Sequence, residues 1–157
     1  MSTGIDEVDG GPATDCNGHG LHVSGTLAGT CYGVAKGVRV VAVRVLDCAG
    51  SGSTSRVLAG LDWLLHHHVR PAVLNLSLGG APSAALDAEV RALFRDGVVV
   101  VAAAGNGDAD GQAVDACTTS PPAPASRSPS APPTGPTPGP SGPTPAAAWT
   151  CSRPGCP

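Results

Sequence analysis

A histidine between two glycines is the residue in this sequence most suited to chemistry. His19 lies in the segment N-G-H-G-L-H-V-S-G-T, residues 17–26, after which the chain becomes apolar and small. An imidazole carries protons near neutral pH, and flanking glycines let another backbone approach closely. A lone loop histidine is more often a helix cap than a catalyst, so the interpretation of His19 depends on what the rest of the chain brings near it.

Two glycine-rich turns follow apolar segments that are typical of buried strands. Ser77-Leu78-Gly79 follows the run 72–77, and Gly105-Asn106 follows the run 98–104. Binding sites of parallel sheets lie beyond the carboxyl ends of the strands. We therefore expect both turns and His19 to converge on one edge of a sheet.

Helix and strand patterns alternate from residue 19 onward. The expected elements are helices over 19–28, 53–66 and 83–97, and strands over 38–46, 72–77 and 98–104. Buried strands joined by helices predict an α/β fold with a parallel sheet. Residues 1–16 are polar and glycine-rich and predict a loop, in which we expect Asp6, Asp9 and Asp15 to be solvated.

The composition divides the chain into two parts. Residues 1–121 predict a partial globular domain, whereas 122–157 are rich in Pro, Ala, Ser and Thr and predict a disordered tail. The net charge of −3 and a charged fraction of 13% give no basic surface for nucleic acid. We also expect no membrane segment. Six cysteines are typical of a secreted protein, but the residues after Met1 do not have the pattern of a signal peptide. These two observations conflict, and the conflict predicts that this sequence lacks an upstream part.

Four motifs, in order, resemble the subtilisin-like serine proteases, in the branch that includes proteinase K. They are the histidine segment 17–26, the block 32–53, the L-N-L-S-L-G-G segment 74–80 and the A-A-A-G-N segment 102–106. The resemblance covers roughly residues 6–121. It implies a subtilisin-like three-layer α/β fold with a parallel sheet, here incomplete, and hydrolysis of peptide bonds by a Ser-His-Asp triad.

The resemblance also implies roles for individual residues. His19 is the general base, and the side-chain amide of Asn106 donates to the oxyanion. Substrate would pair with the chain as an added strand, beside a small apolar specificity pocket. The implied substrate-binding residues are Ser77, Leu78, Gly79, Gly50, Ser51, Gly52, Ala104 and Gly105. Cys16 and Cys48 match a disulfide pair of this branch, whereas Cys31 has no assigned partner.

Two members of the triad are missing from the sequence. The family's aspartate lies in a D-T-G or D-S-G turn some thirty residues before the histidine, but only eighteen residues precede His19. The segment 2–5 resembles such a turn, but it has serine in place of aspartate and lies too close to His19, and residues 4–10 fit better as the loop before the histidine motif. The family's serine motif, G-T-S-M-A, does not occur. With GC-rich codons, family-like sequence read one base out of frame yields segments 128–140 and 148–155, which predicts a frame change near Pro121. A natural Pro/Thr-rich linker is the alternative that is less favoured. We expect the chain alone to be inactive.

Two other interpretations stay open. The chain could be a non-catalytic pseudoprotease that binds peptides along residues 77–79. A metal site built from His19, His22 and the run 66–68 is less favoured, because no third ligand has a fixed spacing. Catalysis by the family needs no cofactor, although structural calcium is expected in a complete member. The expected partner is a polypeptide substrate, and we expect a monomer, secreted by analogy with the family.

Overall fold

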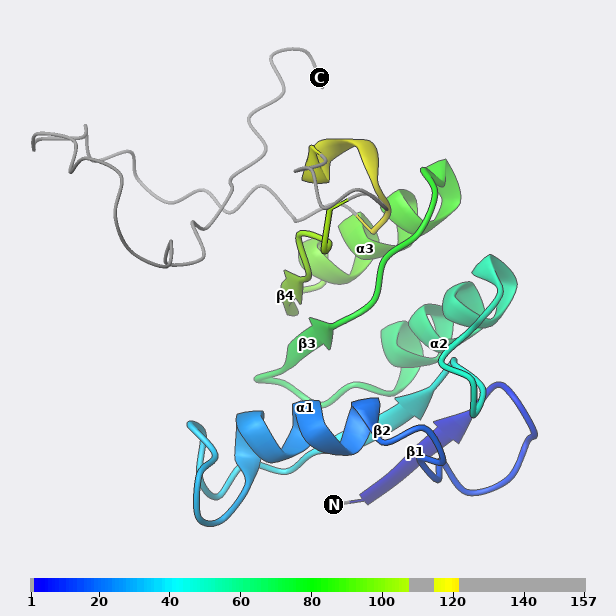
Figure 1. Ribbon diagram of the computed structural model, residues 1–157. Coiled ribbons are helices and arrows are strands. Elements are labelled where there is room, and N and C mark those ends of the chain that lie inside the picture. The colour runs from blue at the N-terminus through cyan, green and yellow to red at the C-terminus, as the bar shows by residue number, and fades with distance from the viewer. Residues whose placement is uncertain (1, 108–114, 122–157) are drawn as a thin grey trace, which may run out of the picture.

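The computed structural model describes residues 2–107 and 115–121 (Figure 1). Its elements are β1 (Ser2–Asp6), α1 (His19–Ala28), β2 (Val41–Arg44), α2 (Thr54–His67), β3 (Val73–Leu76), α3 (Ala84–Arg95), β4 (Val99–Ala102) and the short 3-10 turn η1 (Ala116–Thr118). Every element expected after residue 18 is present, although the three expected strands are shorter than their apolar runs. The predicted tail, 122–157, lies outside the described residues.

Serine caps fix the starts of two helices where the sequence predicts them. The Ser53 hydroxyl accepts a hydrogen bond from the backbone N–H of Arg56 at the start of α2. Ser83 does the same for Leu86 at the start of α3. Such caps satisfy N–H groups that the first turn of a helix leaves without partners. At the far end of α3, Gly97 adopts a φ of 84°, which stops the helix.

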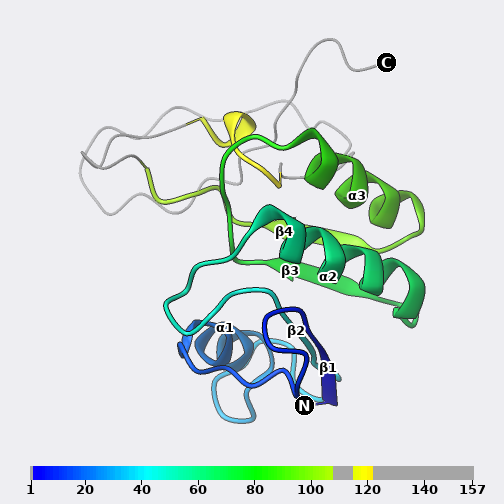
Figure 2. The same cartoon turned by 90° about the vertical axis from the view of Figure 1, so that its right-hand side faces the viewer.

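The described strands form two separate parallel pairs rather than one continuous sheet. β1 pairs with β2, and β3 pairs with β4 in the register Val73 to Val99 through Leu76 to Ala102. α1 lies on one side of the strands, and α2 and α3 lie on the other (Figures 1 and 2). The α/β class, the parallel pairing and the three layers are therefore as predicted, and the sheet is interrupted.

The core lies between the α2–α3 side and the strands. Its most enclosed residues are Leu61, Val90 and Leu93, which are 2%, 1% and 0% exposed. α2 and α3 present apolar residues at helical spacing toward the strands, which bury part of their own apolar side chains in return. The buried apolar residues are Val45, Val57, Leu61, Leu76, Leu86, Val90, Leu93, Val98 and Val100.

The prediction of a solvated loop over residues 1–16 is wrong at its start. Ser2–Asp6 is strand β1, and Asp6 is 5% exposed. The Arg44 guanidinium donates from Nη1 to Asp6 and to Asp9, at 2.7 Å each. Burial opposes ionisation of Asp6, but backbone N–H groups of Val8 and Asp9 and the Arg44 charge outweigh it, so its pKa lies below the ordinary value.

Candidate active site

His19 is the first residue of α1, and a carboxylate builds the turn that leads into it. Gly18 precedes it at a φ of 94°, a left-handed conformation that glycine adopts without strain. One carboxylate oxygen of Asp15 accepts from the N–H groups of Asn17 and Gly18, at 2.9 and 2.8 Å. Its other oxygen accepts from the N–H of Leu21 at 2.7 Å. Asp15 thereby takes the place of a helix-capping side chain.

Asp15 is held in its charged form by these contacts. The N–H groups of Leu21 and Gly18 lower the pKa of its carboxyl below the ordinary value, with a smaller contribution from the nearby His19. The expectation that Asp15 is simply a solvated carboxylate is therefore wrong. Its signal in the sequence was its place just before the helix that begins at His19, where an aspartate suits both the free N–H groups and the helix dipole.

The predicted disulfide between Cys16 and Cys48 is confirmed. It joins the turn before His19 to the loop after β2. The side-chain amide of Asn17 donates to the Cys48 carbonyl at 3.1 Å and ties the same two segments together. The loop that carries the histidine is thus fixed to the carboxyl end of β2. Cys31 is exposed and free.

The His19 ring reaches the end of β3. Its Nε2 lies 2.9 Å from the backbone carbonyl oxygen of Ser77, the residue directly after that strand. A carbonyl oxygen only accepts, so Nε2 is the donor in this contact. In the neutral ring the proton is therefore on Nε2, and Nδ1 is left as the basic nitrogen. A general base that accepts a proton at Nε2 needs the other tautomer, in which Nε2 is free and Nδ1 carries the proton.

The segment 77–79 continues from β3 into the space beside His19. Ser77 and Leu78 are half-buried, and Gly79 is exposed. The Asn75 amide donates to the Ser77 hydroxyl at 2.9 Å, so that hydroxyl is held against its own strand. Gly80 then pairs with Ser120 through backbone hydrogen bonds of 2.9 and 3.2 Å. The segment is therefore anchored at both ends.

The loop 50–52 is less suited to pairing with a substrate. The Ser51 N–H donates to the Asp47 carboxylate at 3.0 Å, and the Ser51 carbonyl accepts from the Asp47 N–H at 2.8 Å. Gly50 turns the chain at a φ of 78°. The Gly50 N–H also donates to the Asp47 carbonyl, at 3.0 Å. Because these groups are engaged within the loop, the Gly50 carbonyl and Gly52 are left to pair with a substrate there.

The segment predicted for the oxyanion follows β4. Ala104, Gly105 and Asn106 are exposed beyond the carboxyl end of that strand, and Gly105 has a φ of 92°. Ala103 is still attached to β3, because its N–H donates to the Leu76 carbonyl at 3.0 Å. The predicted residues therefore follow the carboxyl ends of β2, β3 and β4, and the structure shows His19 in contact with the middle one.

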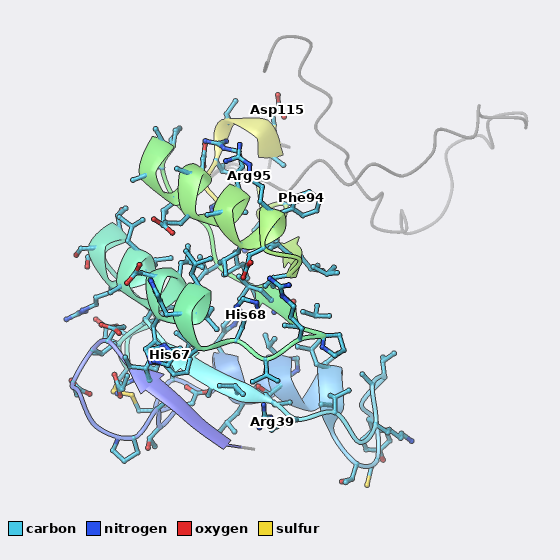
Figure 3. All side chains as sticks on the ribbon, turned by 180° about the vertical axis from the view of Figure 1, so that it is seen from behind. Arg39, His67, His68, Phe94, Arg95 and Asp115 are labelled. Atoms are coloured by element: carbon cyan, nitrogen blue, oxygen red, sulfur yellow. A yellow bond between two sulfur atoms is a disulfide. The ribbon has the colours of Figure 1, made fainter. Side chains whose placement is uncertain are left out.

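The histidine run at the end of α2 has structural partners. His67 stacks on Trp63 with ring centroids 4.6 Å apart, and His68 Nε2 lies 3.2 Å from Asp96. Figure 3 shows His67 and His68 where α2 ends. In the part of the chain that the structure describes, no group of three His, Cys, Asp or Glu residues could hold a metal ion.

One buried polar cluster escaped the sequence analysis. Ser120 is 2% exposed, and its hydroxyl donates to the Asp87 carboxylate at 2.7 Å. The same oxygen accepts from the Ser83 N–H at 2.8 Å. With a carboxylate and a backbone amide as partners, Ser120 ties the segment after β4 to the start of α3. The serine itself gave no signal in the sequence, because its partners lie more than thirty positions away.

Comparison with known proteins gives consistent results at the level of sequence and of structure. The model of the subtilase family matches residues 3–133. The extracellular serine proteinase of Thermus sp. (strain Rt41A) is 60% identical over 122 residues, which are 77% of this chain and 28% of that protein. Alkaline serine exoprotease A of Vibrio alginolyticus is 52% identical over 120 residues, 76% of this chain and 22% of that protein.

A solved structure agrees with these relatives. The crystal structure of a cold adapted subtilisin-like serine proteinase superposes with a TM-score of 0.71 at 50% identity, and covers 76% of this chain and 42% of that one. The chain spans about a quarter of the length of the two relatives. No helix among the described residues is long and apolar enough to cross a membrane. The family match and the high identities place this chain in the subtilase family.

Proposed function

We propose that this chain supplies part of the peptidase domain of a secreted subtilisin-like serine endopeptidase. The observation that carries the proposal is the contact between His19 and the Ser77 carbonyl, because it brings two motifs 58 positions apart into one site. The disulfide and Asp15 hold the histidine turn in place. Two relatives are named as proteinases or exoproteases, and one of them is named as extracellular.

In this proposal His19 takes the proton from a serine nucleophile and returns it to the leaving amine. The ring must then give up its donation to Ser77 and carry its proton on Nδ1, where a carboxylate would hold it. An extended polypeptide substrate pairs with the backbone of 77–79, and the Asn106 amide donates to the oxyanion. Ala104 and Gly105 leave room for the substrate side chain.

A polypeptide of residues 1–157 contains neither a D-T-G or D-S-G turn nor the G-T-S-M-A motif. We infer that such a polypeptide forms no acyl-enzyme, because oxyanion stabilisation without a nucleophile cannot form one. Structural calcium belongs to the proposal only for a longer family member. Among the residues that the structure describes, no group of three His, Cys, Asp or Glu residues could hold a metal ion.

The test uses a longer chain. The coding DNA is sequenced across codon 121 and translated in every frame, and a chain that carries the D-T-G turn and G-T-S-M-A is produced. We expect it to cleave a peptide substrate, and His19→Ala to lower kcat roughly a millionfold, a loss typical of a subtilisin. His22→Ala is the matched control and should keep most activity. Equal losses in both variants, or no frame that yields the motifs, would overturn the proposal.

A second candidate is peptide binding without catalysis. It is favoured by the segment 77–79, which lies at an accessible strand end. Titration of the 157-residue chain with extended peptides, followed by the backbone amide signals of Leu78 and Gly79, tests it. Saturable shifts of those amides together with a cooperative thermal melt support this function. Unchanged amides at millimolar peptide would exclude it.

A further inference from the structure

The sequence contains two Asn-Gly pairs, the dipeptide in which an asparagine side chain is most readily converted to a carboxylate. They are Asn17-Gly18 in the histidine motif and Asn106-Gly107 after β4. In this conversion the backbone nitrogen of the following residue attacks the side-chain amide carbon, and a glycine there has no side chain to obstruct the attack. The two pairs have the same chemistry, so a difference between them must come from the fold.

The pair in the histidine motif is held at both reacting groups. The Gly18 N–H, whose nitrogen would have to attack, donates to the Asp15 carboxylate at 2.8 Å. The Asn17 amide donates to the Cys48 carbonyl at 3.1 Å, in a loop that the disulfide also ties down. Attack at Asn17 therefore requires both hydrogen bonds to break first, and one of them has a charged acceptor.

Aspartate before glycine can close the same ring, and two Asp-Gly pairs of the described residues are held in the same way. In both pairs an arginine binds the carboxylate, and the glycine N–H donates to a backbone carbonyl. The pairs are Asp9-Gly10, held by Arg44 and the Asp6 carbonyl, and Asp96-Gly97, held by Arg70 and the Phe94 carbonyl. A third such pair, residues 110–111, lies outside the described residues.

The Asn-Gly pair after β4 has none of these restraints. Asn106 and Gly107 are both exposed, and Gly107 adopts a φ of 89°. Among the residues that the structure describes, none forms a hydrogen bond with the Asn106 side-chain amide or with the Gly107 N–H. The attacking nitrogen and the amide carbon are thus both accessible, and no hydrogen bond has to break before they meet.

We propose that Asn106 is a site of spontaneous deamidation, and that the fold protects Asn17 from the same reaction. The Gly107 nitrogen loses its proton to base and bonds to the side-chain carbonyl carbon of Asn106. The bond from that carbon to the amide nitrogen breaks, and the nitrogen takes up a proton and leaves as ammonia. Water then opens the cyclic imide at either carbonyl, which leaves aspartate or isoaspartate at position 106. Water is the only co-reactant.

The consequence of this modification for catalysis rests on the proposed function. In that proposal the Asn106 amide donates to the oxyanion, whereas an ionised carboxylate has no proton to donate. The added negative charge would also oppose the charge that develops on the oxyanion. We therefore expect a longer, active chain to lose about 100-fold or more of its kcat as position 106 converts, a loss typical of subtilisins that lack this donor.

Mass spectrometry of the 157-residue chain tests the modification without any assay of activity. The folded chain is incubated at mildly alkaline pH and digested, and fragment masses report the conversion of amide to carboxylate at each asparagine. The reference is the reduced chain in concentrated urea. We expect Asn106 to convert about as fast in the folded chain as in urea. Asn17 should convert at least about 10-fold more slowly when folded, because a hydrogen bond to a charged group protects it.

Two variants serve as matched controls for the mass measurement. Asp15→Ala frees the Gly18 N–H, so it should speed the conversion of Asn17 in the folded chain and leave the rate at Asn106 unchanged. Asn106→Gln should remove the mass gain at position 106. Slower conversion of Asn106 in the folded chain than in urea would overturn the proposal. Equal rates at Asn17 and Asn106 in the folded chain would overturn it as well.

A longer chain that carries the D-T-G turn and G-T-S-M-A separates the modification from its consequence. Its activity per intact chain is followed together with the mass gain at position 106, and we expect the two to change in step. Full activity after complete conversion would overturn the predicted loss of kcat and the role of Asn106 as oxyanion donor. The mass gain itself would still support the modification, so the two failures are distinguishable.

Discussion

The Cys16–Cys48 disulfide gives the sharpest prediction about stability. Its two cysteines are 32 positions apart, and no other disulfide joins described residues. Closing a loop of that length removes entropy from the unfolded chain worth about 3.7 kcal/mol at 25 °C in the loop-closure model. Because native domains are stable by only about 5–15 kcal/mol, this is a large part of the total.

Removing the Cys16–Cys48 disulfide should also loosen the structure around His19. The bond joins the turn before His19 to the loop after β2, and the remaining direct tie between those segments is the Asn17 bond to the Cys48 carbonyl. We expect the Cys16→Ser/Cys48→Ser double variant to lose about 3–4 kcal/mol. We also expect its His19 ring signals to broaden, because the histidine turn is then held mainly by Asp15.

Urea unfolding, followed by far-UV circular dichroism, measures the loss. The matched control is Cys31→Ser, which removes an exposed free thiol and should shift the free energy of unfolding by less than about 0.5 kcal/mol. A loss below about 1 kcal/mol in the double variant, with an unchanged urea slope, would refute the reasoning. So would equal losses in the double variant and the control.

Three further predictions concern single side chains. The pKa of Asp6 in the folded state lies below its ordinary value of 3.8, so its contribution to stability should be complete above pH 3.8 and be lost as the pH falls through the folded-state pKa. Thermal melts measured at a series of pH values should show a smaller loss of stability at low pH for Asp6→Asn than for the unchanged chain. Asp15→Ala should cost about 1–2 kcal/mol in urea unfolding, because it leaves helix N–H groups uncapped. Leu93→Ala should cost about 2–5 kcal/mol, since Leu93 is fully buried between α3 and the strands; a smaller loss would mean that the core collapses around the cavity.

Helices and the later strands were predictable because their signals are local. The caps Ser53 and Ser83 lie directly before apolar periodic segments, and the valine run after Gly97 is strongly β-forming. Strand β1 was missed because its only apolar residue is Ile5, which is half-buried and lies between Gly4 and Asp6, and because it is a strand only through its pairing with β2. Tertiary context decided that segment, not propensity.

The site was predictable only where its residues lie in local sequence motifs. The motifs located His19 and the strand ends, and parallel topology explains why they meet. The Arg44 pairing with Asp6 and Asp9 joins residues more than thirty positions apart, so no local pattern reveals it. The tautomer of His19 likewise follows only from its contact with Ser77, which no sequence pattern specifies.

The most direct test of the proposed function is active-site labelling of the 157-residue chain. The chain is incubated with a fluorophosphonate, which reacts with activated serines, and its intact mass is measured. The account predicts no adduct, because His19 lies beside a backbone carbonyl and the G-T-S-M-A motif is absent. A stoichiometric adduct on a serine, abolished by His19→Ala and kept in His22→Ala, would contradict it.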